Sequence, residues 1–147
     1  MALRRKAREF ALQMLFQWEM NAQKPARIEA GFWTYARAEK KTRDFANLLF
    51  EGAAARCKEI DALLGRHAKN WRLERMAAID RNILRLAVFE LQGGADTPPK
   101  VAINEAVELA KKFSSAESAP FINGILDAIL KNSHRDTENS EKNGSED

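Results

Sequence analysis

The sequence predicts an all-α protein with six or seven helices. Residues of high helix propensity, chiefly Ala, Leu, Glu, Lys and Arg, are abundant, and the 147 residues include only four prolines and seven glycines. Apolar residues recur with the period of a helix face, and no segment shows the alternation typical of a strand. The apolar fraction of 45% is enough for an interior, in one compact domain or in two small subdomains that share a core.

The first predicted helix spans residues 3–21. Its inward positions follow one helix face: Ala7, Phe10, Ala11, Met14, Leu15 and Trp18. Pro25 ends this helix or follows its end, because proline cannot donate a backbone hydrogen bond. A shorter helix over residues 28–38 would bury Ile28, Phe32 and Tyr35.

The third predicted helix begins near Thr42, whose hydroxyl can accept a free backbone N–H of the first turn. Its apolar stripe, which includes Phe45 and Leu48, continues to Leu64. Gly52 lies in this stripe and has no Cβ, so it would let a neighbouring helix approach closely.

Three further segments complete the predicted order. A helix over residues 73–92 stops at the glycine pair 93–94, and the paired prolines 98–99 belong to a loop. A helix over residues 101–113 follows, and the last helix has Ser118 as a plausible cap and Pro120 in its first turn. We therefore expect one helical domain over residues 1–131 and a disordered acidic tail over residues 132–147.

The formal net charge of +3 hides an uneven distribution. Basic residues cluster at the start of the chain, and acidic residues gather in the tail. The single cysteine, Cys57, excludes an intramolecular disulfide and fits a reducing compartment. No apolar run approaches the roughly 20 residues of a membrane span, and the start is not a secretory signal. These observations predict a cytoplasmic protein with no membrane partner.

No pattern in the sequence indicates an enzyme, a cofactor or a metal centre. His67 has no Cys or His at a metal-ligand spacing, and the chain has no glycine-rich phosphate loop. Glu105 and Glu108 share a helix face, as paired catalytic carboxylates would. Lys111 follows within one turn, which favours a solvated or partner-facing stripe instead.

The first helix carries the best binding signal. Arg5, Leu12 and Phe16 fall on a side away from the inward stripe, and Arg8 lies near its edge. Single-stranded RNA is held by cations on its phosphates and aromatic rings on its bases. A basic surface end with Phe16 packed against the second helix explains the same pattern, and composition alone favours it. An outward Leu12 would also permit a homodimer that covers this surface.

The break between Phe113 and Phe121 is a second feature. Ser114, Ser115 and Ser118 lie there at the start of the last helix, where free N–H groups suit an anion such as an RNA phosphate. A serine-capped interhelical turn accounts for the same residues, and composition does not separate the two interpretations.

Three segments together resemble the NusB family of transcription antitermination factors. They are VAINEAVELAKKF at residues 101–113, PFINGILD at residues 120–127 and DRNILRLAVFEL at residues 80–91. REFALQMLFQW at residues 8–18 looks like the Arg-rich first helix of that family. The resemblance covers residues 4–130 and implies an all-α fold of two packed helical subdomains.

The resemblance implies a non-enzymatic RNA-binding function. Members bind the box A element of nascent RNA, most strongly with NusE, a small-subunit ribosomal protein. The complex joins RNA polymerase and reads through terminators, notably in ribosomal RNA operons. The resemblance assigns RNA contacts to Arg4, Arg5, Lys6, Arg8, Gln13, Phe16, Ser118 and Phe121. It places the NusE surface around Glu74, Asp80 and Arg81, where acidic residues suit a basic partner.

Two alternatives stay open. The chain fits a helical protein-interaction module without an RNA role, or an RNA-binding domain related to that of ribosomal RNA cytosine methyltransferases. No methyltransferase region is present in the 147 residues, which argues against the second alternative. Phe16 also departs from the family pattern, because many members have a tyrosine there. With phenylalanine there, a contact made by the tyrosine hydroxyl would be lost, whereas stacking of the ring on an RNA base would be kept.

Overall fold

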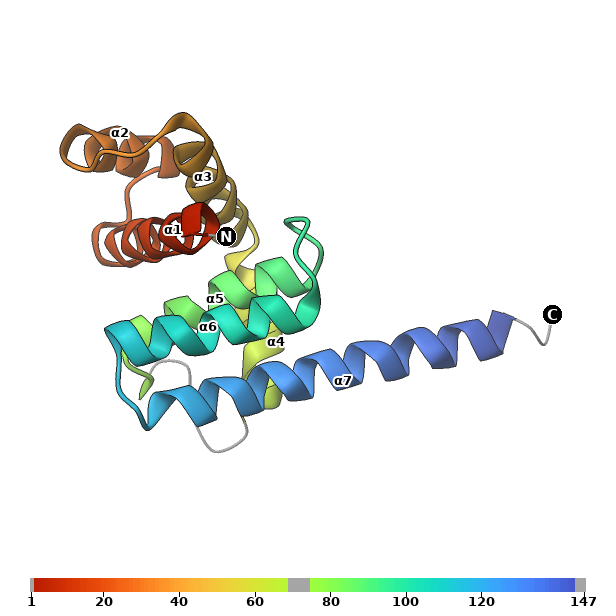
Figure 1. Ribbon diagram of the computed structural model, residues 1–147. Helices are drawn as coiled ribbons and strands as arrows, with labels where there is room; N and C mark the ends of the chain where they lie inside the picture. Colours follow the sequence, from red (N-terminus) through yellow and green to blue (C-terminus); the bar gives the residue numbers. More distant parts are fainter. Residues whose placement is uncertain (1, 69–74, 145–147) are drawn as a thin grey trace.

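The computed structural model describes residues 2–68 and 75–144, which form seven α-helices and no strand (Figure 1). The helices are α1 (Ala2–Asn21), α2 (Pro25–Tyr35), α3 (Lys40–Ala55), α4 (Cys57–His67), α5 (Ala78–Leu91), α6 (Pro99–Phe113) and α7 (Ser118–Gly144). Figure 1 shows α1–α3 as one group and α4–α7 as a second group packed against it. The all-α class and the two packed subdomains are confirmed.

Aromatic rings hold the N-terminal subdomain together. The rings of Phe10 on α1 and of Phe32 and Trp33 on α2 meet edge to face, with centroids 4.9–5.7 Å apart. Trp33 Nε1 donates a hydrogen bond of 2.8 Å to Asn47 Oδ1 on α3, which satisfies its polar edge. The predicted inward stripe of α1 is confirmed, because Trp18 is partly buried and the other five members are buried: Ala7, Phe10, Ala11, Met14 and Leu15.

Helix α5 is the centre of the molecule. It packs against α1, α3, α4, α6 and α7, and every residue from Asn82 to Glu90 is buried. A helix surrounded by neighbours has no solvated face. Its polar side chains, Asn82, Arg85 and Glu90, must therefore find partners inside the protein.

Two glycines make room for a buried ring of α5. A Cβ built on Gly52 of α3 or on Gly94, just after α5, would lie 2.0 Å from ring atoms of Phe89. The predicted close approach at Gly52 is confirmed. Gly93 ends α5 with a φ of +81°, a backbone conformation that suits glycine, as the predicted stop requires.

Several predicted boundaries were wrong. Thr42 is buried in the first turn of α3, and Glu39 occupies the cap position. The long stripe breaks at Arg56, whose φ of −104° and ψ of 17° turn the chain into α4. The break lets α4 pack on α5 and α7, and Leu48 is left 46% exposed. The predicted burial of Tyr35 was also wrong, because this last residue of α2 is 91% exposed.

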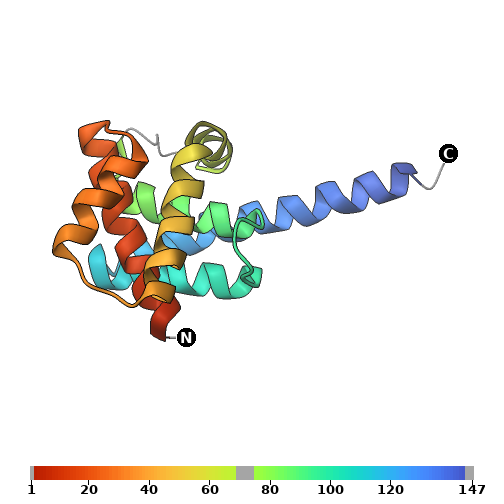
Figure 2. The same ribbon diagram turned by 90° about the horizontal axis from the view of Figure 1, so that it is seen from above.

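The tail also differs from the prediction. The sequence predicts disorder from residue 132, whereas α7 continues to Gly144 and projects from the body in both views (Figures 1 and 2). No proline or glycine interrupts the chain between Gly124 and Gly144, so nothing in the backbone stops the helix earlier.

A carboxyl pair between α2 and α3 predicts a pH dependence of stability. Burial, followed by a hydrogen bond and charge repulsion from Glu51, raises the pKa of Glu29 to about 8 from 4.5. The folded protein thus binds more protons than the unfolded chain between these values, so its free energy of unfolding should fall as pH rises from 4.5 to about 8. Urea denaturation across this range measures the slope. Glu29→Gln should flatten it, and an equal slope in that variant would contradict the assignment.

Candidate RNA-binding surface

The basic start of α1, defined as Arg4, Arg5 and Lys6, is exposed to solvent. Arg5 donates hydrogen bonds of 3.1 and 2.9 Å to the Glu105 carboxylate on α6 and keeps 58% of its side chain exposed. The hydrogen bond from Arg5 lowers the pKa of Glu105. An exposed ion pair of this kind contributes little stability, so Arg5 can exchange its partner for a phosphate at low cost.

The other two cations differ in their partners. Lys6 lies 3.3 Å from the buried Glu9 carboxylate, which also accepts a 2.6 Å hydrogen bond from Lys112 of α6. Burial acts to raise the pKa of Glu9, but hydrogen bonds from Lys112 and Lys6 lower it overall. The Arg4 guanidinium lies 4.7 Å from the ring centroid of Phe45 and donates to the carbonyl oxygen of Asp96.

Arg8 occupies a different environment from these cations. Its Nε and Nη2 lie 3.0 and 2.8 Å from the two carboxylate oxygens of Glu90, and Thr97 donates to the same carboxylate. The two charged side chains are only 5% and 2% exposed. The resemblance implies a phosphate contact for Arg8, which would require this side chain to leave Glu90. In the structure it ties α1 to α5.

Gln13 and Phe16 continue the surface along α1. Gln13 is exposed, and Phe16 is half-buried. The predicted outward position of Leu12 was wrong, because its side chain is only 2% exposed. Helix α1 packs on both α3 and α5, so two of its faces are covered and its apolar stripe is wider than it would be with one neighbouring helix. Leu12 therefore gives no support to a homodimer.

Ser118 and Asp80 meet at the starts of α7 and α5. Ser118 Oγ donates a 2.9 Å hydrogen bond to Asp80 Oδ2, and Ser114 Oγ donates to Ser118 Oγ at 3.0 Å. Ser115 Oγ accepts the Ser118 N–H, so Ser115 supplies the cap contact that the sequence assigns to Ser118. Phe121, one turn later on α7, is half-buried.

Arg81 is drawn into a polar network beneath the surface. Its guanidinium pairs with Glu19 at the end of α1, donates to the carbonyl oxygen of Met76, and is 12% exposed. Glu19 also accepts from Asn82 at 2.7 Å. The third residue of the predicted NusE surface, Glu74, lies outside the described residues.

Sequence reasoning missed the second half of this network. Arg85 donates hydrogen bonds of 2.8 and 2.7 Å to Asp61 on α4 and lies 3.4 Å from Glu19. Burial acts to lower the pKa of Arg85, but the Asp61 partner raises it overall. The available signal was the presence of Asn82 and Arg85, one turn apart, among the apolar residues at the middle of the helix.

The carboxylates on α6 carry ion pairs. Glu105 holds Arg5, and Glu108 lies 3.5 Å from Lys111 on the same helix, as the predicted charged stripe requires. Within the described part of the chain, no group of His, Cys, Asp and Glu side chains is arranged to hold a metal ion. None of the helices described is both long and apolar enough to cross a membrane.

Comparison with known proteins assigns the family. A model described as the NusB family matches residues 5–131. Transcription antitermination protein NusB of Koribacter versatilis is 51% identical over 129 residues, covering 87% of this chain and 88% of the relative. The protein of the same name from Myxococcus xanthus is 48% identical over 134 residues, covering 88% and 95%. These names describe a non-enzymatic function.

Solved structures share the fold. A T. maritima NusB is 37% identical with a TM-score of 0.77, covering 87% of this chain and 90% of that one. A crystal structure of antitermination factors NusB and NusE in complex with dsRNA contains a chain that is 28% identical, with a TM-score of 0.80. That match covers 89% of this chain and 98% of the other. With sequence, fold and coverage in agreement, this chain belongs to the NusB family.

Proposed function

We propose that this protein is a transcription antitermination factor that binds box A of nascent ribosomal RNA transcripts together with NusE. Curated relatives carry the antitermination name, and a related chain has been crystallised with NusE and dsRNA. The observation that carries the proposal is the basic start of α1, where Arg5 and Lys6 keep 58% and 57% of their side chains exposed. Exposed cations provide phosphate contacts, which dominate RNA affinity.

The RNA path in this proposal begins at Arg4, Arg5 and Lys6. Gln13 and Phe16 follow along α1, where the ring can stack on a base and the amide can hydrogen bond to one. Ser118 and Phe121 extend the surface onto α7. Arg8 supports the path from below, because its ion pair with Glu90 holds α1 against α5.

The NusE surface in this proposal includes Asp80 and Arg81 at the start of α5, and also Glu74, which lies outside the described residues. Asp80 is 8% exposed and Arg81 is 12% exposed. These two residues therefore offer a partner little contact area of their own and act mainly by holding the start of α5 in position. Because Asp80 bonds to Ser118, the partner surface adjoins the RNA surface. NusE and α1 would then present one continuous RNA-binding face to the transcript within the RNA polymerase complex. Association with NusE would raise the affinity for RNA without any catalytic step.

A charge-matched pair of variants tests the RNA contact. Arg5→Gln removes a cation from the proposed path, whereas Lys24→Gln removes one beyond the far end of α1, and that end lies about 24 Å from Arg5 along the helix axis. We expect Arg5→Gln to weaken binding of labelled box A RNA in the presence of NusE. We also expect the slope of the logarithm of the binding constant against the logarithm of the salt concentration to become shallower by about 0.7. Fluorescence anisotropy at two salt concentrations measures both quantities.

The control and the contrary outcomes are distinct. Lys24→Gln should bind as the wild type does, and a scrambled RNA should bind more weakly than box A. Equal binding by Arg5→Gln and Lys24→Gln would remove α1 from the RNA path. NusE binding without any RNA binding would favour the protein-interaction module, and the absence of both would contradict the proposal as a whole.

A further inference from the structure

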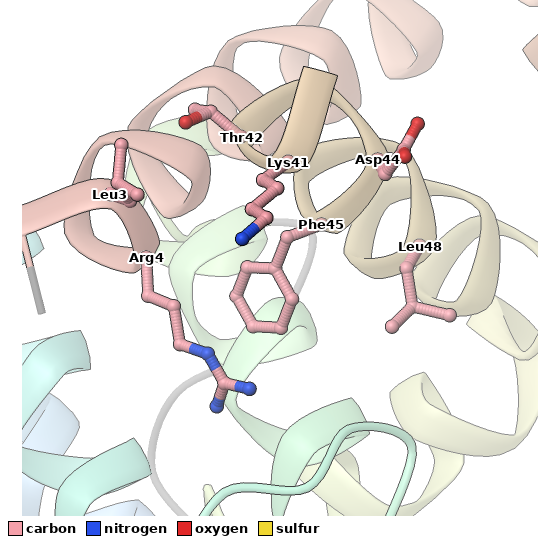
Figure 3. A pocket seen from close by; sticks show the side chains of 7 residues that line it. All are labelled: Leu3, Arg4, Lys41, Thr42, Asp44, Phe45 and Leu48. Atoms are coloured by element: carbon pink, nitrogen blue, oxygen red, sulfur yellow. The ribbon is translucent and has the colours of Figure 1, made fainter. Parts of the chain in front are cut away.

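A groove of about 530 Å³ lies between the start of α1 and the first half of α3 (Figure 3). Its lining residues are Leu3, Arg4, Lys41, Thr42, Asp44, Phe45 and Leu48. The volume falls within the roughly 300–1,000 Å³ typical of small-molecule sites. None of the residues that the resemblance assigns to RNA, apart from Arg4, belongs to this groove.

The groove gathers exposed apolar surface. Leu3 is 48% exposed and Leu48 is 46% exposed, and both line it. Between them lies the ring of Phe45, which is partly buried against the core. Large apolar side chains on a soluble surface mark a binding site when they occur together. Here they lie in the same hollow as an aromatic ring.

Two cations of the groove lack an acidic partner. Arg5 and Lys6 are paired with Glu105 and Glu9, whereas neither Arg4 nor Lys41 forms an ion pair with any described residue. Figure 3 shows both side chains directed toward the space beside the Phe45 ring. Arg4 has neutral partners, the Phe45 ring and the carbonyl oxygen of Asp96, so its charge is not balanced by a carboxylate. Cations without an acidic partner next to apolar side chains suit a ligand with both an anionic and an aromatic part.

We propose that this groove takes one nucleotide of a single-stranded RNA, with the base against Leu3, Phe45 and Leu48 and the phosphate beside Arg4 and Lys41. The inference rests on the proposed RNA-binding function and adds a site on α3 to it. Continuity supports RNA over a protein segment, because Arg4 belongs both to the groove and to the basic start of α1. A strand that contacts Arg5 and Lys6 would therefore pass the mouth of the groove.

Neighbouring lysines of α3 provide a matched test. Lys41 lines the groove and Lys40 does not, and both side chains are exposed, so Lys41→Gln and Lys40→Gln differ only in position. The probe is a labelled single-stranded box A RNA, measured by anisotropy with the full-length protein and NusE. Lys41→Gln should weaken binding about threefold to tenfold and lower the salt slope by about 0.7. Lys40→Gln should stay within about twofold of the wild type.

The apolar part of the site needs a second readout. Leu48→Ser changes an exposed side chain and should weaken RNA binding without altering the salt slope, because no phosphate contact is lost. A box A RNA carrying 4-thiouridine should crosslink to the peptide that contains residues 41–48, and Leu48→Ser should reduce the yield.

The outcomes separate this inference from the function on which it rests. If Arg5→Gln weakens RNA binding while Lys41→Gln and Leu48→Ser match Lys40→Gln and no crosslink reaches α3, the groove is not on the RNA path. If Leu48→Ser weakens NusE binding in the absence of RNA and leaves RNA binding unchanged, the groove docks a protein and the inference is overturned. A wild-type protein that binds no RNA would overturn both proposals.

Discussion

Replacing Arg8 by methionine should lower the free energy of unfolding by about 3–5 kcal/mol, because it leaves the Glu90 carboxylate buried without its cation. Arg8 and Glu90 are 5% and 2% exposed, and both Arg8 nitrogens that face the carboxylate are within hydrogen-bonding distance. Thr97 donates only one hydrogen bond to the Glu90 carboxylate, so it cannot replace the hydrogen bonds that Arg8 supplies. Urea or guanidinium denaturation monitored by circular dichroism measures the loss.

Two controls isolate the unpaired charge as the cause. Arg5→Met removes a 58% exposed cation from its pair with Glu105 and should leave the free energy of unfolding close to that of the wild type, because solvent screens an exposed ion pair. Adding Glu90→Leu to Arg8→Met removes the stranded carboxylate and should recover much of the lost stability. If Arg8→Met unfolds at the wild-type denaturant concentration, the ion pair does not hold α1 against α5.

The same variants separate stability from RNA recognition. The stabilised double variant lacks Arg8 yet should keep the basic start of α1 in place, since Arg4, Arg5 and Lys6 are untouched. Near-wild-type RNA binding by this variant would indicate a supporting role for Arg8. A loss as large as that of Arg5→Gln would indicate that Arg8 leaves Glu90 to meet the RNA.

Gly52→Ala should destabilise the protein by about 1–3 kcal/mol through overpacking. The new Cβ would lie 2.0 Å from the tip of the Phe89 ring, and a Cβ on Gly94 would meet the same end of that ring. Phe89 is only 5% exposed, so the ring has little free space into which it can move. Thermal or chemical denaturation gives the change in the free energy of unfolding.

A helical glycine with open space around it is the natural control. Nothing lies within 4 Å of a Cβ built on Gly31 of α2, so Gly31→Ala should be neutral or stabilise by up to about 1 kcal/mol. In a Phe89→Leu background the cost of Gly52→Ala should shrink, and a double-mutant cycle measures that coupling. An unchanged cost would place the strain elsewhere than at the ring.

The helices themselves could be predicted because helix periodicity is a local property of the chain. The inward face of α1, the stop at Gly93 and the close approach at Gly52 all follow from residues within a few turns of one another. The basic start of α1 is visible for the same reason, since its three cations are consecutive. A local pattern says which face of a helix is apolar.

The tertiary structure decided how many faces are covered. Leu12 is buried because α1 has α5 as well as α3 for a neighbour, and Arg8 meets Glu90 across 82 positions of sequence. Likewise, Asp80 and Ser118 come together only because α5 and α7 start at the same end of the molecule. The sequence by itself thus determined the all-α class, the helices and the cationic first turns of α1. Only packing decided which charges stay exposed to an RNA, because a charge inside a multi-helix junction must be paired to remain there.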